Sequence, residues 1–536
     1  MYRGNWRVVL LSVLVLIGLL STAPGAPLYA QGPTKGGTLK VGLVGDVGAI
    51  DPAFSYDFTT GAVVPQITEG LLRFDQDMKL EPALAESWEN PDVLTYIYHL
   101  RPGVKFSDGT PMTADDVVFS MERVRNPETA SQLGWVYANV DTITKVDEDT
   151  IQVKLAKPDA LWQYGVATSA AHVISQKYFE ANKEKFGKPD GPPVGTGPFK
   201  LVDWQPGTEL VLEPNPYYWD SANGPWLDQV VFKVLPEATA RTVALKTGDI
   251  DLTLGPDSVA IDQFSIVEAM PNVKLHKNIG FQVDYVVFNC QREPFTDPKV
   301  RQAFYYALDL ESIVKEIVKD GGIPGKPTMV TPSMWIFEQE KFQKAFDALP
   351  TYAHDLEKAK ELLSQTAVPN GFQATLVTDN APIRVSIALA MQSAVKPLGV
   401  DLKVEQVTWQ EMINRLQNTL DYDLSMDIWA SDFPDPAGNI YPTHISTNIG
   451  NGGANQSAYV NEEVDRLLNA QNNSTDPAER ADLMIQAQAI IAEEAPEIVI
   501  DYPYLTMAIN NNFTGYMVTP MWFWQSWTRL IYQVAQ

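Results

Sequence analysis

A chain of 536 residues is too long for a single hydrophobic core, so we expect about two to four domains. The composition, 45% hydrophobic and 20% charged, excludes an intrinsically disordered protein. The 66 acidic residues outnumber the 40 Lys and Arg and give a formal charge of −26, which argues against nucleic acid as a partner because phosphate binding needs clustered cations. A single cysteine excludes an intrachain disulfide.

The first thirty residues have the layout of a secretory signal peptide. Arg3 and Arg7 form a short basic region, residues 8–20 are apolar, and a Pro-rich stretch ends at Ala30. The apolar run is too short to cross about 30 Å of hydrocarbon, and no cysteine follows it closely to carry a lipid anchor. We expect cleavage after Ala30 and a soluble periplasmic product that is not a lipoprotein. The alternative is an uncleaved membrane anchor.

The first half of the mature chain predicts short strands interrupted by a few helices. Residues 38–43 alternate in polarity and predict a strand, whereas residues 64–72 predict a helix. Thr113 is expected to cap a helix whose first turn is acidic. A helix at residues 238–247 should end at Gly248. Further strands are predicted at residues 94–100, 143–146, 151–155, 199–204, 210–213, 230–234, 251–254, 273–276 and 285–289.

The second half alternates regularly between helices and strands. Asp297 and Pro298 supply a cap and a first helical residue, and Val300 and Phe304 then fall on one face. Helices are predicted at residues 356–363, 383–396, 409–417, 461–470 and 477–495, and strands at 374–378, 400–407, 423–429 and 498–502. This alternation predicts an α/β fold.

No sequence motif indicates catalysis. Residues 321–326 (GGIPGK) differ from a phosphate-binding loop because one residue too few separates the first glycine from the Gly-Lys pair, and Pro327 stands where Ser or Thr would bind Mg²⁺. No GxSxG elbow is present. The five histidines lie far apart in the sequence, which excludes a paired-histidine metal helix, and we expect them and Cys290 to be structural. The remaining enzymatic alternative is a secreted hydrolase with two facing carboxylates.

Several longer segments resemble one known family. The chain contains ITEGLLRFDQDMKLEPALAESWE at residues 67–89, YHLRPGVKFSDGTPMTADDVVFSMERV at 98–124, VFNCQREPFTDPKVRQAFYYALD at 287–309 and WASDFPDP at 429–436. Shorter matches begin at Gly195, Leu212, Leu245 and Asn461. In this order they resemble the family 5 extracellular solute-binding proteins, which are the dipeptide-, oligopeptide- and nickel-type receptors of ABC importers.

The resemblance implies a type II periplasmic-binding-protein-like, two-lobed α/β fold with an additional inserted domain. It also implies a ligand cleft between the lobes, no cofactor or metal, and no enzymatic activity. The hinge is expected near residues 280–289 and 498–504. The implied division is residues 1–30 (signal peptide), 31–70, 195–280 and 499–536 (domain I), 71–194 (domain II, inserted) and 281–498 (domain III, the opposite lobe).

The motif at residues 429–436 is the first candidate ligand site. It follows a predicted strand, and loops at strand ends hold ligands in α/β proteins. In peptide-binding members of the family an Asp of this motif pairs with the ligand's α-ammonium group and a Trp lines the pocket. The resemblance therefore implies these roles for Asp432 and Trp429. The alternative is that Asp432 only caps the following turn, with Asp435 as the competing acid.

The segment after Asp51 and Pro52 is the second candidate site. In peptide binders the matching residues run alongside the bound peptide backbone, which would let an extended ligand pair with them as a β-strand does. These residues are Ser55, Tyr56, Asp57 and Phe58. The alternative is an ordinary surface loop. Asn289, at the expected lobe crossover, is a further candidate.

The sequence departs from the oligopeptide-binding pattern at one position. Oligopeptide binders have an Arg three residues before the Trp, where this chain has Met426, so the motif supplies no cation for a ligand carboxylate. Arg415 is near in sequence. The motif also lacks a His, which weakens a nickel-type role.

We expect a monomeric periplasmic receptor that captures a short peptide or peptide-like amine and delivers it to the membrane permease of an ABC importer. One alternative is an oligosaccharide receptor of the same family, because the 13 Trp residues offer faces that stack on sugar rings. The other alternative, from a different class, is the secreted hydrolase.

Overall fold

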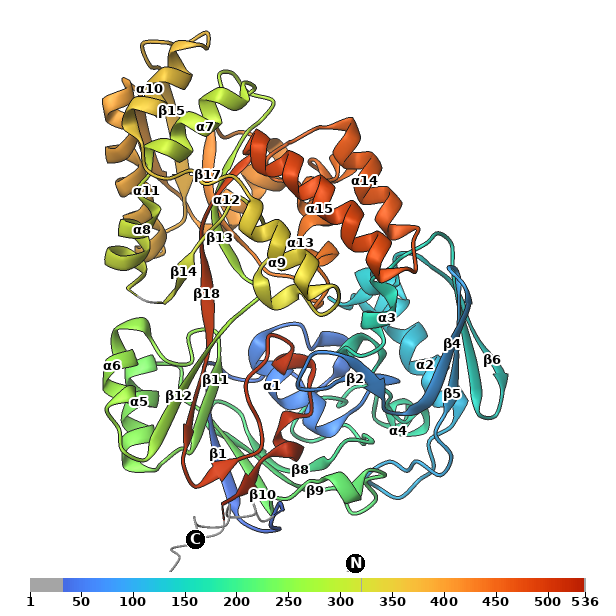
Figure 1. Cartoon of the computed structure of the whole chain (residues 1–536). Helices are drawn as coiled ribbons and strands as arrows, with labels where there is room; N and C mark the ends of the chain where they lie inside the picture. The colour runs from blue at the N-terminus through green and yellow to red at the C-terminus, as the bar shows by residue number, and fades with distance from the viewer. Residues whose placement is uncertain (1–31, 320, 535–536) are drawn as a thin grey trace, which may run out of the picture.

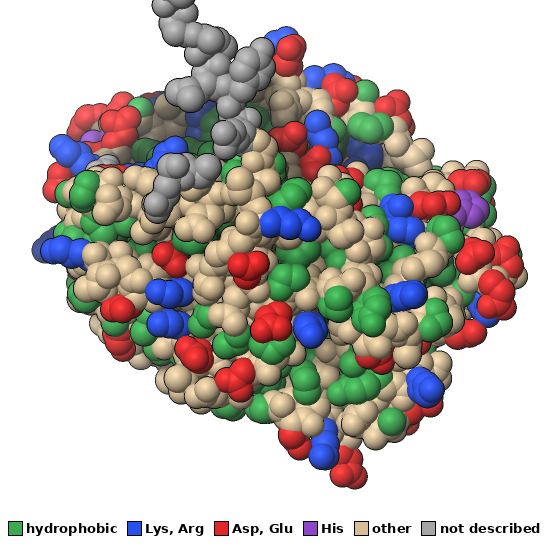
Figure 2. All heavy atoms as spheres, turned by 90° about the horizontal axis from the view of Figure 1, so that it is seen from below, with side chains coloured by type: hydrophobic (Ala, Val, Ile, Leu, Met, Phe, Trp, Pro, Cys, Tyr) green, Lys and Arg blue, Asp and Glu red, His purple; other side chains and the backbone are tan. Residues whose placement is uncertain are grey.

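The computed structural model describes residues 32–319 and 321–534. The expected signal peptide, residues 1–30, lies outside the described residues. Within those residues, no helix combines the length and the apolar character needed to cross a bilayer. Acidic and basic side chains are interspersed over the face seen from below (Figure 2). On that face the negative charge is spread out, as expected of a charge that serves solubility.

One long strand, β18 (Glu497–Asn510), runs through both lobes and joins their sheets (Figure 1). Its first half pairs with β13 (Val283–Phe288) and β14 (Gly322–Pro324). Its second half pairs with β11 (Leu252–Gly255) and β12 (Val273–Ile279). The lobes therefore share one twelve-stranded sheet, and β18 is a covalent and hydrogen-bonded connection between them.

The first lobe contains β11, β12 and the second half of β18 together with four more strands. These are β1 (Thr38–Leu43), β8 (Phe199–Gln205), β9 (Glu209–Pro214) and β10 (Gln229–Val234). Its helices are α1 (Phe58–Ile67), α5 (Ala238–Thr247) and α6 (Phe264–Glu268). Helix α5 ends at Gly248 with φ +79°, a left-handed conformation that glycine adopts without strain, as the sequence predicts. Short strands β19 (Phe513–Thr514) and β20 (Tyr532–Gln533) close the C-terminal segment.

The inserted domain has its own four-stranded sheet, in the order β4-β5-β7-β6 (Figure 1). Its strands are β2 (Leu72–Phe74), β3 (Leu80–Pro82), β4 (Ala85–Asp92), β5 (Thr95–Leu100), β6 (Val140–Asp147) and β7 (Thr150–Leu155), and its helices are α2 (Ala114–Arg125), α3 (Trp162–Gly165) and α4 (Gln176–Asn182). Thr113 and Asp116 form a capping box at the start of α2. The distinctive FSDGTPMTADD segment is therefore architectural.

The opposite lobe contains β13, β14 and the first half of β18, with strands β15 (Gln373–Thr378), β16 (Asp401–Gln406) and β17 (Leu424–Trp429). Its helices are α7 (Pro298–Ala307), α8 (Leu310–Ile313), α9 (Gln339–Ala348), α10 (Leu356–Ser364), α11 (Pro382–Val395), α12 (Trp409–Asn414), α13 (Ala437–His444), α14 (Glu462–Asn472) and α15 (Pro477–Glu494). Strands β15 and β17 are parallel, so their carboxyl ends meet at one edge of the sheet.

The alternation of strands and helices is confirmed, and the predicted bounds differ most from the observed ones for a helix and a strand. The helix expected at residues 64–72 is α1, which begins at Phe58 because Asp57 caps it. The strand expected at residues 498–502 is the first third of β18, which continues past Pro503 because neighbouring strands in both lobes pair with it.

The domain boundaries stay a proposal, and strand pairing bears on two of them. Strands β4 to β7 pair with one another, all within residues 71–194. Strand β18 pairs with the opposite lobe as far as Pro503 and with the first lobe from Tyr504. This pairing favours a final boundary near residue 503, a few residues beyond residue 498.

Candidate ligand-binding site

Asp432 lies in the loop that follows β17 and contacts the first lobe. The Tyr56 hydroxyl donates a hydrogen bond to Asp432 Oδ2 at 3.2 Å. The structure thus brings together two predicted site residues that are 376 positions apart in the sequence. Trp429, the last residue of β17, is half-buried, and its indole Nε1 is buried without a hydrogen-bond partner among the described residues. This edge of the sheet therefore carries an acid that contacts the other lobe and an indole N–H that has no partner among the described residues.

The Asp432 carboxylate is held without a balancing cation. Burial raises its pKa to about 7, and the only opposing influence in the described chain is the hydrogen bond from Tyr56. Burial and the nearby Asp432 charge raise the pKa of the Tyr56 hydroxyl above its usual range, so this hydroxyl remains a donor. A carboxylate in this state gains free energy from a cationic partner, because the cation offsets the loss of water around the ionised form.

Asp435, the competing acid of the same motif, is already paired. Its side chain is fully buried and accepts hydrogen bonds from Arg480 Nη1 at 2.8 Å and Arg480 Nη2 at 3.0 Å. Asp435 also accepts the Ala437 N–H at 2.9 Å, at the start of α13. The turn is therefore capped by Asp435, and Asp432 remains available for a ligand.

The segment at residues 55–58 only partly fits the expectation of a strand-like contact with the ligand. The Asp57 carboxylate caps α1 by accepting two backbone N–H groups at 2.9 and 2.8 Å. Phe58 is the first residue of that helix and stacks on Trp522, with ring centroids 6.0 Å apart. Ser55 is fully buried, and its Oγ has no hydrogen-bond partner among the described residues. A ligand backbone could pair with at most residues 55–57, which is shorter than expected.

Asn289 does not join this group. In the β13–β17 pair Val283 lies opposite Trp429, and Asn289 follows the other end of β13, roughly 20 Å away at about 3.4 Å per residue. Its side-chain amide donates to the carbonyl oxygens of Leu420 and Tyr422, both at 3.1 Å. The expectation that Asn289 lies at the lobe crossover was wrong, because the crossover is at the opposite end of β13.

Motif matching also missed Arg384, a cation whose charge reaches Asp427 in β17. It lies in the first turn of α11 and binds the Asp379 carboxylate through Nε at 2.7 Å and Nη2 at 2.5 Å. Arg415, the cation considered from the sequence, is paired with Glu405 and Glu411. An acid and an arginine five residues apart at a strand-to-helix turn are the only sequence signal for Arg384.

Phe433, next to Asp432, contacts the inserted domain. Its ring lies 6.0 Å from Tyr164 and 5.7 Å from Trp135, measured between centroids. The Tyr164 hydroxyl also lies 3.4 Å from Asp435 Oδ2 and donates to it. The loop carrying Asp432 therefore contacts all three domains, so its position depends on how the lobes are arranged.

Comparison with known proteins places the chain in a family. Residues 79–451 match the model described as "Bacterial extracellular solute-binding proteins, family 5 Middle". The chain is 31% identical to Heme-binding protein A of Haemophilus influenzae, with 85% of each chain covered. It is 28% identical to the Dipeptide-binding protein of Escherichia coli, with 82% of this chain and 84% of that protein covered. The chain belongs to family 5 of the bacterial extracellular solute-binding proteins.

Solved structures confirm the two-lobed type II periplasmic-binding fold expected of this solute-binding protein. HbpA2 from Haemophilus parasuis is similar with a TM-score of 0.81 at 25% identity, covering 93% of this chain and 100% of that one. The oligopeptide-binding protein AppA from Bacillus subtilis, in complex with a nonapeptide, has a TM-score of 0.72 at 26% identity, covering 94% and 100%.

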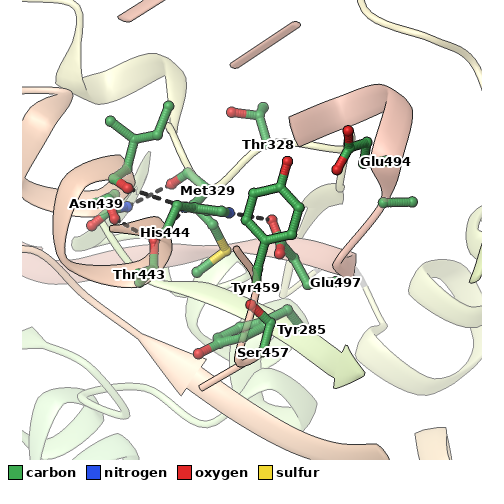
Figure 3. A network of polar contacts seen from close by, with 12 residues as sticks. Tyr285, Thr328, Met329, Asn439, Thr443, His444, Ser457, Tyr459, Glu494 and Glu497 are labelled. Atoms are coloured by element: carbon green, nitrogen blue, oxygen red, sulfur yellow. Dashed lines mark hydrogen bonds and ion pairs between the residues drawn. The ribbon is translucent and has the colours of Figure 1, made fainter. Parts of the chain in front are cut away.

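In this family 5 protein a buried polar network anchors the helix that follows Asp432 (Figure 3). His444 Nε2 lies 3.0 Å from Glu497 Oε1, at the start of β18. Asn439 Nδ2 donates to the Met329 carbonyl oxygen at 2.6 Å. The first contact ties α13 to the start of β18, and the second ties it to the segment that follows β14. His444 is structural, as the sequence predicts, and it helps to fix the loop that carries Asp432.

Proposed function

We propose that the chain is a periplasmic substrate-binding protein that captures a short peptide or peptide-like amine between its lobes and delivers it to an ABC import permease. One observation carries the proposal: the half-buried Asp432 lies at the lobe interface with Tyr56 as a donor and with no cation paired to it among the described residues. An ammonium group is the partner that this carboxylate lacks.

Several relatives have names that support a peptide as ligand. They include a Dipeptide-binding protein and AppA with a bound nonapeptide. Heme-binding protein A, however, is equally covered and slightly more similar in sequence. The family therefore leaves the ligand open, and the choice of an amine rests on Asp432.

The remaining polar groups supply further contacts for such a ligand. Trp429 Nε1 and Ser55 Oγ are buried and have no partner among the described residues, so both gain from a ligand carbonyl or hydroxyl. Arg384, whose charge reaches Asp427 in β17, is a candidate partner for a ligand carboxylate, although it already binds Asp379. Closure of the lobes around the ligand removes water and strengthens each of these interactions.

The proposal includes an exported, monomeric protein whose signal peptide is cleaved, with no lipid anchor and no enzymatic activity. Support for an oligosaccharide ligand is small. Among the described tryptophans only Trp135 and Trp409 are more than about a third exposed, at 43% and 37%. Trp135 packs on Phe433 and Trp409 lies against Arg384, so neither ring is a free platform for a sugar.

The proposal is tested by calorimetric titration of the protein, stripped of bound ligand by unfolding and refolding, with defined di- to pentapeptides. Asp432→Asn should weaken binding by about 2–5 kcal/mol, because a ligand ammonium then loses its charged partner. Asp421→Asn, which changes an exposed acid of the same lobe, should have no effect. Saturable peptide binding that Asp432→Asn leaves unchanged would contradict the proposal, as would equal affinity for N-acetylated peptides.

A further inference from the structure

Two carboxylates face each other where the lobes join. Asp284 in β13 and Asp501 in β18 are directly opposite residues of an antiparallel strand pair. Such residues have Cβ atoms about 4.5–5.5 Å apart, and like charges at these positions repel each other. Neither strand needs an acid here for its pairing, because the ladder uses backbone groups. The pair therefore serves some purpose other than the stability of the unliganded fold.

Asp501 is buried and unpaired. Its side chain is 1% exposed, and neither carboxylate oxygen has a hydrogen-bond partner among the described residues. Gly322 in β14 lies beside it, and a Cβ atom at that position would stand 2.5 Å from Asp501 Oδ2. Glycine therefore leaves the room in which this carboxylate sits. Asp284, unlike Asp501, accepts a side-chain hydrogen bond, which Gln282 Nε2 donates to its Oδ1 at 2.8 Å.

The charges around the pair are mostly negative. Asp257, in the first lobe, raises the pKa of Asp284 through its charge. Asp427, in β17, lies opposite Tyr285 instead of Asp284, and its Oδ2 accepts the Tyr285 hydroxyl at 3.2 Å. Arg384 is the cation whose charge reaches both Asp284 and Asp427, but its guanidinium is bound to Asp379.

Burial and neighbouring negative charges favour the protonated forms of Asp284 and Asp501. Burial raises the pKa of Asp284 to about 6. Burial, followed by the neighbouring Asp284 charge, raises the pKa of Asp501 to about 8. One added positive charge would stabilise the ionised forms of these two adjacent carboxyls. It would offset the loss of water around them and reduce the repulsion between them.

The pair also lies beside the candidate site. In the β13–β17 pair, Asp284 lies opposite Ile428, the residue before Trp429. Because neighbouring strand residues point to opposite faces, Asp284 and Trp429 lie on different faces of this strand pair, and a ligand would reach both around the end of β17 at Trp429. The described residues contain no group of three or more His, Cys, Asp or Glu arranged to hold a metal ion, so an organic cation fits the pair better.

We propose that Asp284 and Asp501 form a second cation subsite, which receives the ammonium or guanidinium group of a ligand side chain while Asp432 holds the α-ammonium group. This inference rests on the proposed function and narrows its ligand class to peptides or amines with a second basic group.

The test compares lysine with norleucine, which has a similar shape and no charge. Tri-alanine peptides carrying either residue at each of the three positions are titrated into ligand-free protein at pH 7.5. We expect lysine to bind at least about tenfold more tightly than norleucine at one position. Asp501→Asn and Asp284→Asn should abolish that preference while leaving the norleucine peptide's affinity within about threefold. Asp251→Asn, which changes a half-buried acid at the far end of β11, should retain the preference.

A second measurement separates failure of the subsite from failure of the proposed function. Thermal unfolding is followed with 1,4-diaminobutane or CaCl₂ for the wild type, Asp432→Asn and Asp501→Asn. If no tripeptide binds, stabilisation by the diamine that is lost in Asp501→Asn still supports the subsite. Equal affinity for lysine and norleucine at all three positions would overturn it. Equal diamine stabilisation of wild type and Asp501→Asn, or stabilisation by calcium alone, would also overturn it.

Discussion

Buried carboxylates at the domain junctions differ from those at the lobe interface. Asp51 accepts hydrogen bonds from Arg123 Nη1 at 2.8 Å and Nη2 at 2.6 Å, between the first lobe and the inserted domain. Asp435 is bound by Arg480 in the same two-pronged way. Asp501 is buried and Asp432 is half-buried, yet neither forms an ion pair with another described residue. Burial alone therefore does not separate these two groups of acids, whereas the missing counter-cation does, and the proposed ligand contacts rest on that difference.

Glu69 shows that the chain can satisfy a buried acid even without a direct arginine contact. The Tyr218 hydroxyl donates to its Oε1 at 3.0 Å, and Trp219 Nε1 donates to its Oε2 at 2.8 Å. Asp501 has no such donor among the described residues. The difference suggests that the acids at the lobe interface are left open for a group that the protein itself does not supply.

The largest expected effect comes from removing a built-in counter-cation. Arg480→Met leaves Asp435 fully buried without its partner, and we expect a loss of about 3–5 kcal/mol in the free energy of unfolding, measured by urea denaturation. Asp432→Asn should change that free energy by less than about 1 kcal/mol, because it removes an acid that has no cation to lose.

A double variant serves as the control for this comparison. Arg480→Met combined with Asp435→Asn should recover more than half of the lost stability, since the amide is neutral and can still accept the Ala437 N–H. If Asp432→Asn destabilises the protein as much as Arg480→Met does, the two classes of buried acid are not distinct.

Sequence reasoning located the parts of the candidate site that lie in short motifs. Asp432 and Tyr56 came from segments with a recognisable local pattern, and the structure brings them together. The hinge acids could not be found this way. Asp284 and Asp501 are 217 positions apart by their residue numbers, and only the register of β13 against β18 makes them neighbours. The pattern of apolar residues in a strand indicates which face of the sheet each side chain takes. It does not determine how β13 aligns with β18.

The role assigned to Asn289 failed for a related reason. The sequence places it near an expected crossover, but a strand has two ends, and the pairing of β13 with β17 puts Asn289 at the wrong one. Arg384 was missed because its bond to Asp379 spans a turn between β15 and α11 that has no distinctive motif. Long-range pairing and turn geometry, rather than composition, decided these positions.

A smaller effect is expected on the pH dependence of stability. The pKa of Asp501 is raised to about 8 in the folded protein, above about 3.9 in the unfolded chain. The folded state therefore binds more protons in this range, and the contribution of Asp501 to stability falls as the pH rises from about 4 to 8. Asp501→Asn should be more stable than the wild type by about 1–3 kcal/mol at pH 8 and nearly equal to it at pH 4.

Asp51→Asn is the matched variant from the other class of acid. It weakens a paired carboxylate, so thermal unfolding at pH 8 should show a lower melting temperature, opposite in sign to Asp501→Asn. A loss of stability in both variants at pH 8 would mean that Asp501 has a partner cation in solution.

The smallest expected effect concerns the Tyr56 hydroxyl. Its hydrogen bond lowers the pKa of Asp432, which burial has raised to about 7. Peptide binding through an ionised Asp432 should therefore strengthen as the pH rises through about 7 in the ligand-free protein. Tyr56→Phe removes the hydrogen bond and should move this midpoint upward by about 0.5–1 pH unit, followed by calorimetric titration at several pH values. An arginine or lysine hidden near Asp432 would instead place the midpoint below about 5 and leave it insensitive to Tyr56. The direction and size of this one shift thus report whether Asp432 belongs with the unpaired acids or with the paired ones.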